Sequence, residues 1–113
     1  MRKAYRVRKN QEYKAIMELK QFVSSSAYTL YYAPRKEDKS RIGLSVSKKL
    51  GIAVIRNKIK RQIRMMCQDV TEFDEKFDCI ILVRSAYLKQ DFETNRKALE
   101  NSFNKIKIKV QTL

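Results

Sequence analysis

The sequence contains no histidine and only two cysteines, two glycines and one proline. Without histidine, both the commonest metal ligand and the commonest general base are missing, and two cysteines alone do not make a zinc site. Cys67 falls in a helical pattern and Cys79 opens an apolar strand, so we expect two buried, reduced thiols rather than a disulfide. The scarcity of glycine and proline argues against a wholly disordered chain.

Long apolar runs are also missing. The longest, residues 79–83, is as long as a strand, whereas a membrane-spanning helix needs about 20 apolar residues. The basic start at residues 1–6 leads into polar residues, which is not typical of a secretory signal. We therefore expect a cytoplasmic protein that has no contact with a membrane. A chain of 113 residues, 43% of them hydrophobic, predicts a single domain over residues 1–113.

Acidic residues are few compared with basic ones: 12 against 26, which gives a net charge of +14 at pH 7. On so small a protein this excess creates a strong positive field that attracts a polyanion. Nucleic acid is the first candidate for this polyanion, and an anionic membrane surface is the second. Solubility alone rarely requires so one-sided a balance.

The first half of the chain predicts a helix followed by strands. Residues 1–9 form a basic arm, and Asn10 is the expected N-cap of the first helix. Residues 28–33 and 41–47 are expected to be strands paired in a hairpin, with a further short strand near Phe22. The apolar positions of the first helix are Tyr13, Ile16, Met17 and Leu19.

A second helix is expected over residues 53–70, with two opposed faces. Its core face is predicted to carry Ile55, Ile59, Ile63, Met66 and Val70. The opposite side carries Asn57, Lys60, Arg61, Arg64 and Gln68, with Arg56 and Lys58 flanking them.

The last third begins with an acidic stretch, residues 69–78, before an apolar strand over 79–84 that we expect at the centre of the sheet. Asp91 is the expected N-cap of a closing helix, and residues 105–113 are expected to fray. The buried stripe of that helix is predicted to be Phe92, Leu99, Phe103 and Ile106. The order α-β-β-β-α-β-α predicts an α+β fold with helices packed on a small mixed sheet.

The second helix is the clearest candidate for a binding surface. Arg56, Lys60 and Arg64 follow at intervals of four residues, about 6 Å apart along the axis, which suits successive phosphates. Like charges at this spacing repel one another, and no acidic residue intervenes, so an ordinary solvated surface is the weaker interpretation. The preceding segment, residues 41–51, adds Lys48, Lys49 and two glycines that could let the backbone approach a phosphate closely.

Two further clusters leave alternatives open. Tyr13, Tyr28, Tyr31 and Tyr32 could stack on single-stranded bases, but alternation along the strand puts Tyr31 on the face opposite the other two strand tyrosines, and one face must be core. The acidic stretch could supply a magnesium site of a protein nuclease, although a solvated loop explains it more simply. Its acidic residues are Asp69, Glu72, Asp74, Glu75 and Asp78.

The segment from Arg41 to Arg64 resembles the signature of the bacterial ribonuclease P protein subunit. That signature is a glycine-leucine-serine-valine-serine-lysine-lysine strand end followed by an arginine-asparagine-arginine helix. The layout of nearly the whole chain is similar to that family. This chain departs from the family pattern at Lys58, where the motif has arginine, and at Tyr13 and Met17, where the family tends to carry phenylalanine.

The resemblance implies a fold like that of ribosomal protein S5 domain 2, with a left-handed β-α-β crossover around the basic helix, contrary to the usual hand. It also implies an endoribonuclease holoenzyme, ribonuclease P, that removes the 5′ leader of precursor tRNA. Catalysis and most bound Mg²⁺ would belong to the RNA subunit. The expected partners are ribonuclease P RNA and precursor tRNA, with no protein partner required. A ribosomal or rRNA-assembly protein without a nuclease role is the alternative.

Two sets of site residues follow from the motif and the resemblance together. For the RNA subunit they are Lys48, Lys49, Arg56, Asn57, Lys58, Lys60, Arg61 and Arg64. For the leader of precursor tRNA they are Arg8, Lys9, Tyr13, Met17 and Tyr31.

Overall fold

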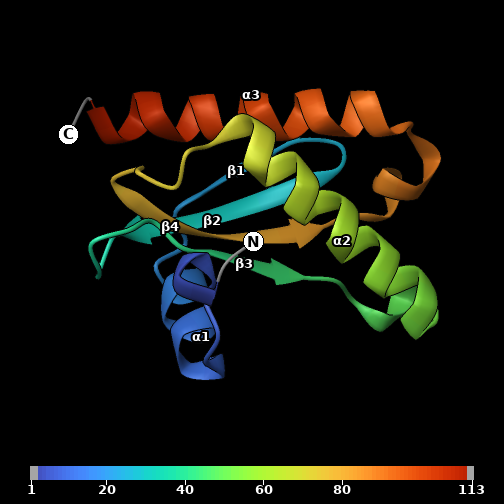
Figure 1. The fold of residues 1–113 in the computed structure, drawn as a ribbon, viewed down its shortest axis with the longest axis horizontal. Helices are drawn as coiled ribbons and strands as arrows, with labels where there is room; N and C mark the ends of the chain where they lie inside the picture. Colours follow the sequence, from blue (N-terminus) through green and yellow to red (C-terminus); the bar gives the residue numbers. More distant parts are fainter. Residues whose placement is uncertain (1–2, 112–113) are drawn as a thin grey trace.

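A mixed sheet separates two helical layers in the computed structural model, which describes residues 3–111 (Figure 1). The strands are β1 (Phe22–Ser24), β2 (Tyr28–Pro34), β3 (Ile42–Ser45) and β4 (Phe77–Val83). The helices are α1 (Asn10–Glu18), α2 (Ala53–Val70) and α3 (Phe92–Gln111). Three short 3₁₀ turns join them: η1 (Lys3–Tyr5), η2 (Lys48–Leu50) and η3 (Ser85–Lys89). The predicted α+β order is confirmed.

The sheet has the strand order β1-β2-β4-β3, so the apolar strand β4 lies in its interior as predicted. It pairs antiparallel with β2 and parallel with β3, and α2 is the connection between the two parallel strands. The predicted hairpin between β2 and β3 is therefore wrong. The polar turn between them led to that expectation, but β4 buries both of its faces only by inserting between the two strands.

The larger core lies between the sheet and the layer of α2 and α3. Strand β2 contributes Tyr28, Leu30 and Tyr32, which alternate onto this face, and each is less than a tenth exposed. Against these side chains pack residues of the two helices: Ile59, Ile63, Met66 and Cys67 of α2, and Leu99, Phe103 and Ile106 of α3. Burying each large side chain stabilises the fold by about 1.5–3 kcal/mol before entropy is counted.

The smaller core lies on the other face, beneath α1. Ile16 of α1 packs with Val7, Ala33 and Ile80. The described part of the basic arm is fixed to the sheet, because the Val7 amide donates to the Ile42 carbonyl at 3.1 Å. Arg6 forms a bridge with the same strand. Met1 and Arg2 of the arm lie outside the described residues.

Helix ends account for most of the other differences from prediction. The N-cap of α1 is Lys9, with Asn10 as the first helical residue. Ile55 and Phe92 are exposed rather than core residues, because each lies in the first turn of its helix, before the helix crosses the sheet. Asp91 does cap α3, since its carboxylate accepts the Thr94 amide at 2.8 Å.

Residues 105–111 belong to α3, contrary to the frayed tail that was expected, and residues 112–113 lie outside the described part. Both cysteines are free and buried, as predicted. Burial raises the pKa of Cys67 to about 12 and raises that of Cys79 as well. Over residues 3–111, no helix has the length and apolar character needed to cross a membrane.

Candidate RNA-binding surfaces

Helix α2 places a cationic surface on the outside of its layer. Its inner side is held against the sheet by Ile59, Ile63 and Met66, which are almost completely buried. The side chains on its outer side are partly or fully exposed: Arg56, Asn57, Lys58, Lys60, Arg61 and Arg64. Periodicity alone thus placed these residues correctly.

The cations of α2 lack acidic partners. Within residues 3–111, none of them lies within 4.0 Å of a carboxylate oxygen. On α3, by contrast, Arg96 contacts Glu93 at 2.8 Å and Glu100 at 3.6 Å. An α-helix that carries unpaired like charges at i, i+4 spacing gains nothing from them in the folded protein. The α2 surface therefore presents positive charge that no carboxylate among residues 3–111 pairs with.

The segment that leads into α2 adds to this surface. Lys48 and Lys49 are exposed on η2, where the Ser47 hydroxyl accepts the Lys49 amide at 3.1 Å. Gly51 then turns the chain with φ of +145°, a conformation that side chains rarely adopt. Its carbonyl accepts from the Arg56 side chain at 3.2 Å, so the turn and the first cation of the row are tied together.

The sheet face beneath α1 carries the second set of predicted residues. The Tyr13 ring packs directly on Gly43, where an added Cβ would lie only 2.8 Å from the ring and 2.6 Å from Ile80. The Tyr13 hydroxyl accepts the Leu44 amide at 3.1 Å. The absence of a side chain at Gly43 therefore makes room for Tyr13, and the expectation that this glycine lets phosphate approach the backbone is wrong.

One row of paired residues crosses this face from edge to edge. Gly43 pairs with Ile80, Ile80 with Tyr31, and Tyr31 with Phe22. Residues directly opposite one another on neighbouring strands share a face of the sheet. Tyr31 thus lies on the same side as Tyr13, and together with Met17 these two pack around the small core.

The structure shows which face of the sheet each tyrosine of β2 occupies, a question that strand alternation had left open. Tyr28 is fully buried in the large core, where its hydroxyl donates to the Asn95 carbonyl at 3.0 Å. Tyr32 packs against Phe77 in the same core, with ring centroids 6.4 Å apart. Tyr31, only partly buried, remains on the α1 face.

The two basic residues predicted beside Tyr13 lie at the start of α1. The Lys9 carbonyl accepts the Tyr13 amide at 3.2 Å, so Lys9 is one helical turn from the ring. Both Arg8 and Lys9 are exposed, and they line a hollow of about 740 Å³. Its other lining residues are Ala4, Arg6, Gln11, Glu12, Lys36, Glu37 and Arg41.

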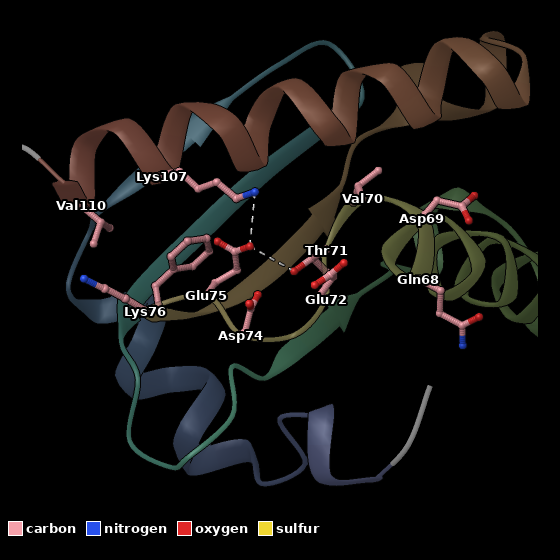
Figure 2. Close-up of a pocket in the computed structure, with 11 residues that line it drawn as sticks. Gln68, Asp69, Val70, Thr71, Glu72, Asp74, Glu75, Lys76, Lys107 and Val110 are labelled. Atoms are coloured by element: carbon pink, nitrogen blue, oxygen red, sulfur yellow. Dashed lines mark hydrogen bonds and ion pairs between the residues drawn. The ribbon is translucent and has the colours of Figure 1, made fainter.

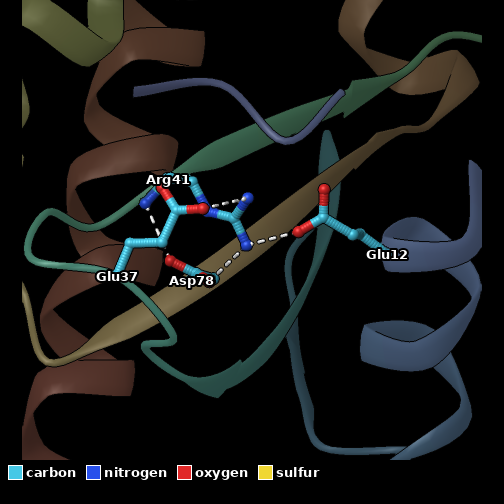
Figure 3. A network of polar contacts seen from close by, with 4 residues as sticks. All are labelled: Glu12, Glu37, Arg41 and Asp78. Atoms are coloured by element: carbon cyan, nitrogen blue, oxygen red, sulfur yellow. Dashed lines mark hydrogen bonds and ion pairs between the residues drawn. The ribbon is translucent and has the colours of Figure 1, made fainter. Parts of the chain in front are cut away.

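A buried ion-pair network fastens α1 to the sheet beside this hollow (Figure 3). Arg41, only 5% exposed, contacts Glu12 of α1 at 2.7 Å and Asp78 of β4 at 3.1 Å. Its backbone amide also donates to Asp78 at 2.9 Å, and Glu37 lies 3.5 Å from the guanidinium. Glu12 immediately precedes Tyr13, so the network also fixes the position of the tyrosine.

The sequence did not predict this network, although an acidic residue directly before an apolar stretch, Asp78, was a sign that a buried cationic partner exists. The hydrogen bond from Arg41 holds the pKa of the Glu12 carboxyl below its ordinary value. Burial alone would lower the pKa of Arg41, but the hydrogen bonds to Glu12 and Asp78 outweigh it and raise that pKa. Both groups are therefore charged at neutral pH.

The acidic stretch lines a separate hollow of about 610 Å³ between the end of α2 and α3 (Figure 2). Glu75 in this hollow is engaged by Lys107 at 3.3 Å and by the Thr71 hydroxyl at 3.4 Å. Asp78 is not part of a solvated loop, since it lies in β4 under Arg41. Over residues 3–111, no group of three or more acidic or cysteine side chains could hold a metal ion.

Fold and surfaces together define a class: a small basic α+β protein with a cationic helix on one side of its sheet and a partly aromatic face on the other. The family model for ribonuclease P matches residues 1–107. The chain belongs to the ribonuclease P protein family.

Curated relatives agree over most of their length. The ribonuclease P protein component of Mesoplasma florum is 42% identical over 95 residues, which cover 82% of this chain and 86% of the relative. That of Bacillus velezensis is 35% identical over 106 residues, which cover 93% and 91% of the two chains.

Solved structures match in fold as well. A ribonuclease P protein of Staphylococcus aureus, a mutant described as having defective mRNA degradation activity, superposes with a TM-score of 0.85 at 36% identity. The match covers 93% of this chain and 90% of that one. The protein from Thermotoga maritima gives a TM-score of 0.73 at 26% identity, over 85% and 92% of the chains.

Proposed function

We propose that this chain is the protein subunit of a ribonuclease P holoenzyme that removes the 5′ leader from precursor tRNA. The observation that carries the proposal is the row of cations on α2, which have no acidic partner among residues 3–111. This α2 surface docks the RNA subunit, with Lys48 and Lys49 extending it. The holoenzyme works in the cytoplasm and needs no further protein subunit.

The α1 face binds the leader of precursor tRNA in this proposal. Single-stranded bases stack on flat side chains, and Tyr13 and Tyr31 both present partly exposed rings there. Met17, which packs against the same small core, supplies a softer apolar contact, while Arg8 and Lys9 offer charge for the leader phosphates. Because mature tRNA has no leader, these contacts favour the substrate over the product.

Catalytic groups and the required Mg²⁺ belong to the RNA subunit. This chain has no histidine, and its best-placed carboxylates, Glu75 and Asp78, are engaged by Lys107 and Arg41. The contribution of the protein is therefore electrostatic and geometric. Neutralising phosphates lowers the concentration of Mg²⁺ that the folded RNA needs, and binding the leader aligns the cleavage site.

The direct test is reconstitution with a bacterial ribonuclease P RNA at low Mg²⁺. The protein should stimulate 5′ cleavage of precursor tRNA well above the rate of the RNA alone. A ribosomal or rRNA-assembly protein would bind RNA through the same charge without stimulating this cleavage, so failure to stimulate would refute the proposal.

The isolated protein serves as the control for a protein-only nuclease. It should not cleave precursor tRNA with Mg²⁺ present. Metal-dependent cleavage by the protein alone that disappears on Asp74→Ala would place the chemistry in the acidic hollow instead.

A further inference from the structure

Phe22 is a large aromatic side chain that the fold leaves without a core role. It is 46% exposed on β1, an edge strand of only three residues, whereas its neighbour Val23 is buried on the other face. A phenylalanine at this exposure gains only part of the burial energy that a core position provides. Part of its ring is therefore accessible to a partner outside the folded chain.

The α1 face continues to Phe22 without interruption. Phe22 pairs with Tyr31 across β1 and β2, and the two ring centroids are 5.5 Å apart. The pair extends the row from Gly43 through Ile80 to Tyr31 by one more strand. Aromatic groups thus occur both at the β3 edge, where Tyr13 covers Gly43, and at the β1 edge.

Positive charge lies next to this second aromatic group. A shallow groove of about 420 Å³ at the β1 edge is lined by Phe22 and by Lys105 of α3. The remaining lining residues are Val23, Ser24, Ile108 and Lys109. A flat ring beside lysines is the combination that holds single-stranded nucleic acid, the ring for a base and the cations for phosphates.

The direction of the bound strand follows from the order of the strands. Strand β3 leads directly through η2 into α2, so its edge is the one next to the proposed docking surface for the catalytic RNA. Strand β1 forms the opposite edge. A leader bound as proposed would therefore cross the face from the β3 edge toward the β1 edge.

We infer that Phe22 and Lys105 extend the leader-binding surface around the β1 edge. They bind leader nucleotides that lie farther from the cleavage site than the nucleotide proposed to stack on Tyr31. This inference rests on the proposed function. It assigns to the chain a second stacking position that depends on leader length.

The test uses the reconstituted holoenzyme and a series of precursor tRNAs whose leaders are shortened from the 5′ end one nucleotide at a time. With wild-type protein, the affinity of the holoenzyme for precursor tRNA should rise once when the leader reaches Tyr31. It should rise a second time when the leader becomes long enough to reach Phe22. Phe22→Ala should abolish that last increase, lowering affinity for long leaders about fivefold or more, the equivalent of one lost base stack. Short leaders and mature tRNA should bind as to wild type.

Matched variants separate stacking from folding. Phe22→Trp should keep the dependence on leader length and Phe22→Leu should lose it, because only a flat ring stacks. Phe92→Ala removes an aromatic ring of similar exposure, 39%, from the start of α3 and should leave the dependence unchanged. Lys105→Ala should weaken binding of long leaders only.

Three outcomes would overturn the inference while leaving the proposed function standing. These are a Phe22→Ala profile that matches wild type at every length, a loss that is equal for leaderless RNA, or a loss confined to short leaders. If wild-type affinity does not depend on the leader at all, the proposed function itself fails.

Discussion

At the scale of the residue, Tyr13 is positioned by neighbours from strand β3 and from its own helix, α1. Gly43 of β3 provides the space for its ring, the Leu44 amide donates to its hydroxyl, and Glu12 beside it is held by Arg41. In the proposed function a leader base stacks on this ring, and a ring already fixed in place would lose less entropy on binding.

Replacing Gly43 tests the close packing under Tyr13. Gly43→Ala should lower the free energy of unfolding by about 1–3 kcal/mol, because the new methyl group overlaps both the Tyr13 ring and Ile80. Chemical denaturation of the isolated protein measures this change. In a Tyr13→Ala background the same substitution should cost less, since only the flexible end of Ile80 must then move. Equal stability of Gly43→Ala and wild type would show that the ring does not pack there.

The Arg41 network predicts a dependence of stability on pH. The folded-state pKa of Glu12 is depressed, so its contribution is present above its ordinary pKa of 4.5 and is lost as pH falls through the lower folded value. Glu12→Gln should lower stability at pH 7 on the order of 1–3 kcal/mol, and the difference from wild type should shrink below pH 4.5. Denaturation across this range measures it. A difference that stays constant with pH would contradict the assignment.

At the scale of the element, α2 was the most predictable part of the molecule. Its span, residues 53–70, agrees with the prediction, and its two faces were predictable because the apolar stripe and the cationic side follow the same helical period, apart from the exposed Ile55. The pairing of β2 with β4 was not predictable, since short apolar strands give no information about their neighbours in a sheet. The Arg41 network was missed for the same reason, because Glu12, Arg41 and Asp78 meet only once that topology exists.

The α2 surface predicts a specific dependence on salt. Replacing Arg61 and Arg64 with alanine should weaken binding to ribonuclease P RNA and flatten the plot of log affinity against log salt by about one unit per lost phosphate contact. Equilibrium binding over a range of salt concentrations measures both effects.

The matched control removes the same charge from α3. Arg96 and Lys107 are both paired with carboxylates, and replacing them with alanine should change affinity and slope far less. If the two double variants behave alike, net charge rather than the α2 surface drives binding.

At the scale of the whole molecule, the sheet separates the two surfaces that are proposed to bind RNA. Helix α2 packs on one face over the large core, and α1 packs on the other over the small core (Figure 1). In the proposed function, docking of the RNA subunit and binding of the leader can therefore occur at once.

The most direct measurement of this division is the ratio of holoenzyme affinities for precursor and mature tRNA, determined with wild-type and Tyr31→Ala protein. Tyr31→Ala should lower affinity for precursor tRNA by about 1–3 kcal/mol and leave affinity for mature tRNA and for the RNA subunit unchanged. Thr29→Ala, a partly buried position on the same face of β2, should leave the ratio as in wild type. An equal loss for precursor and mature tRNA, or weaker binding of the RNA subunit, would contradict a leader site on the α1 face.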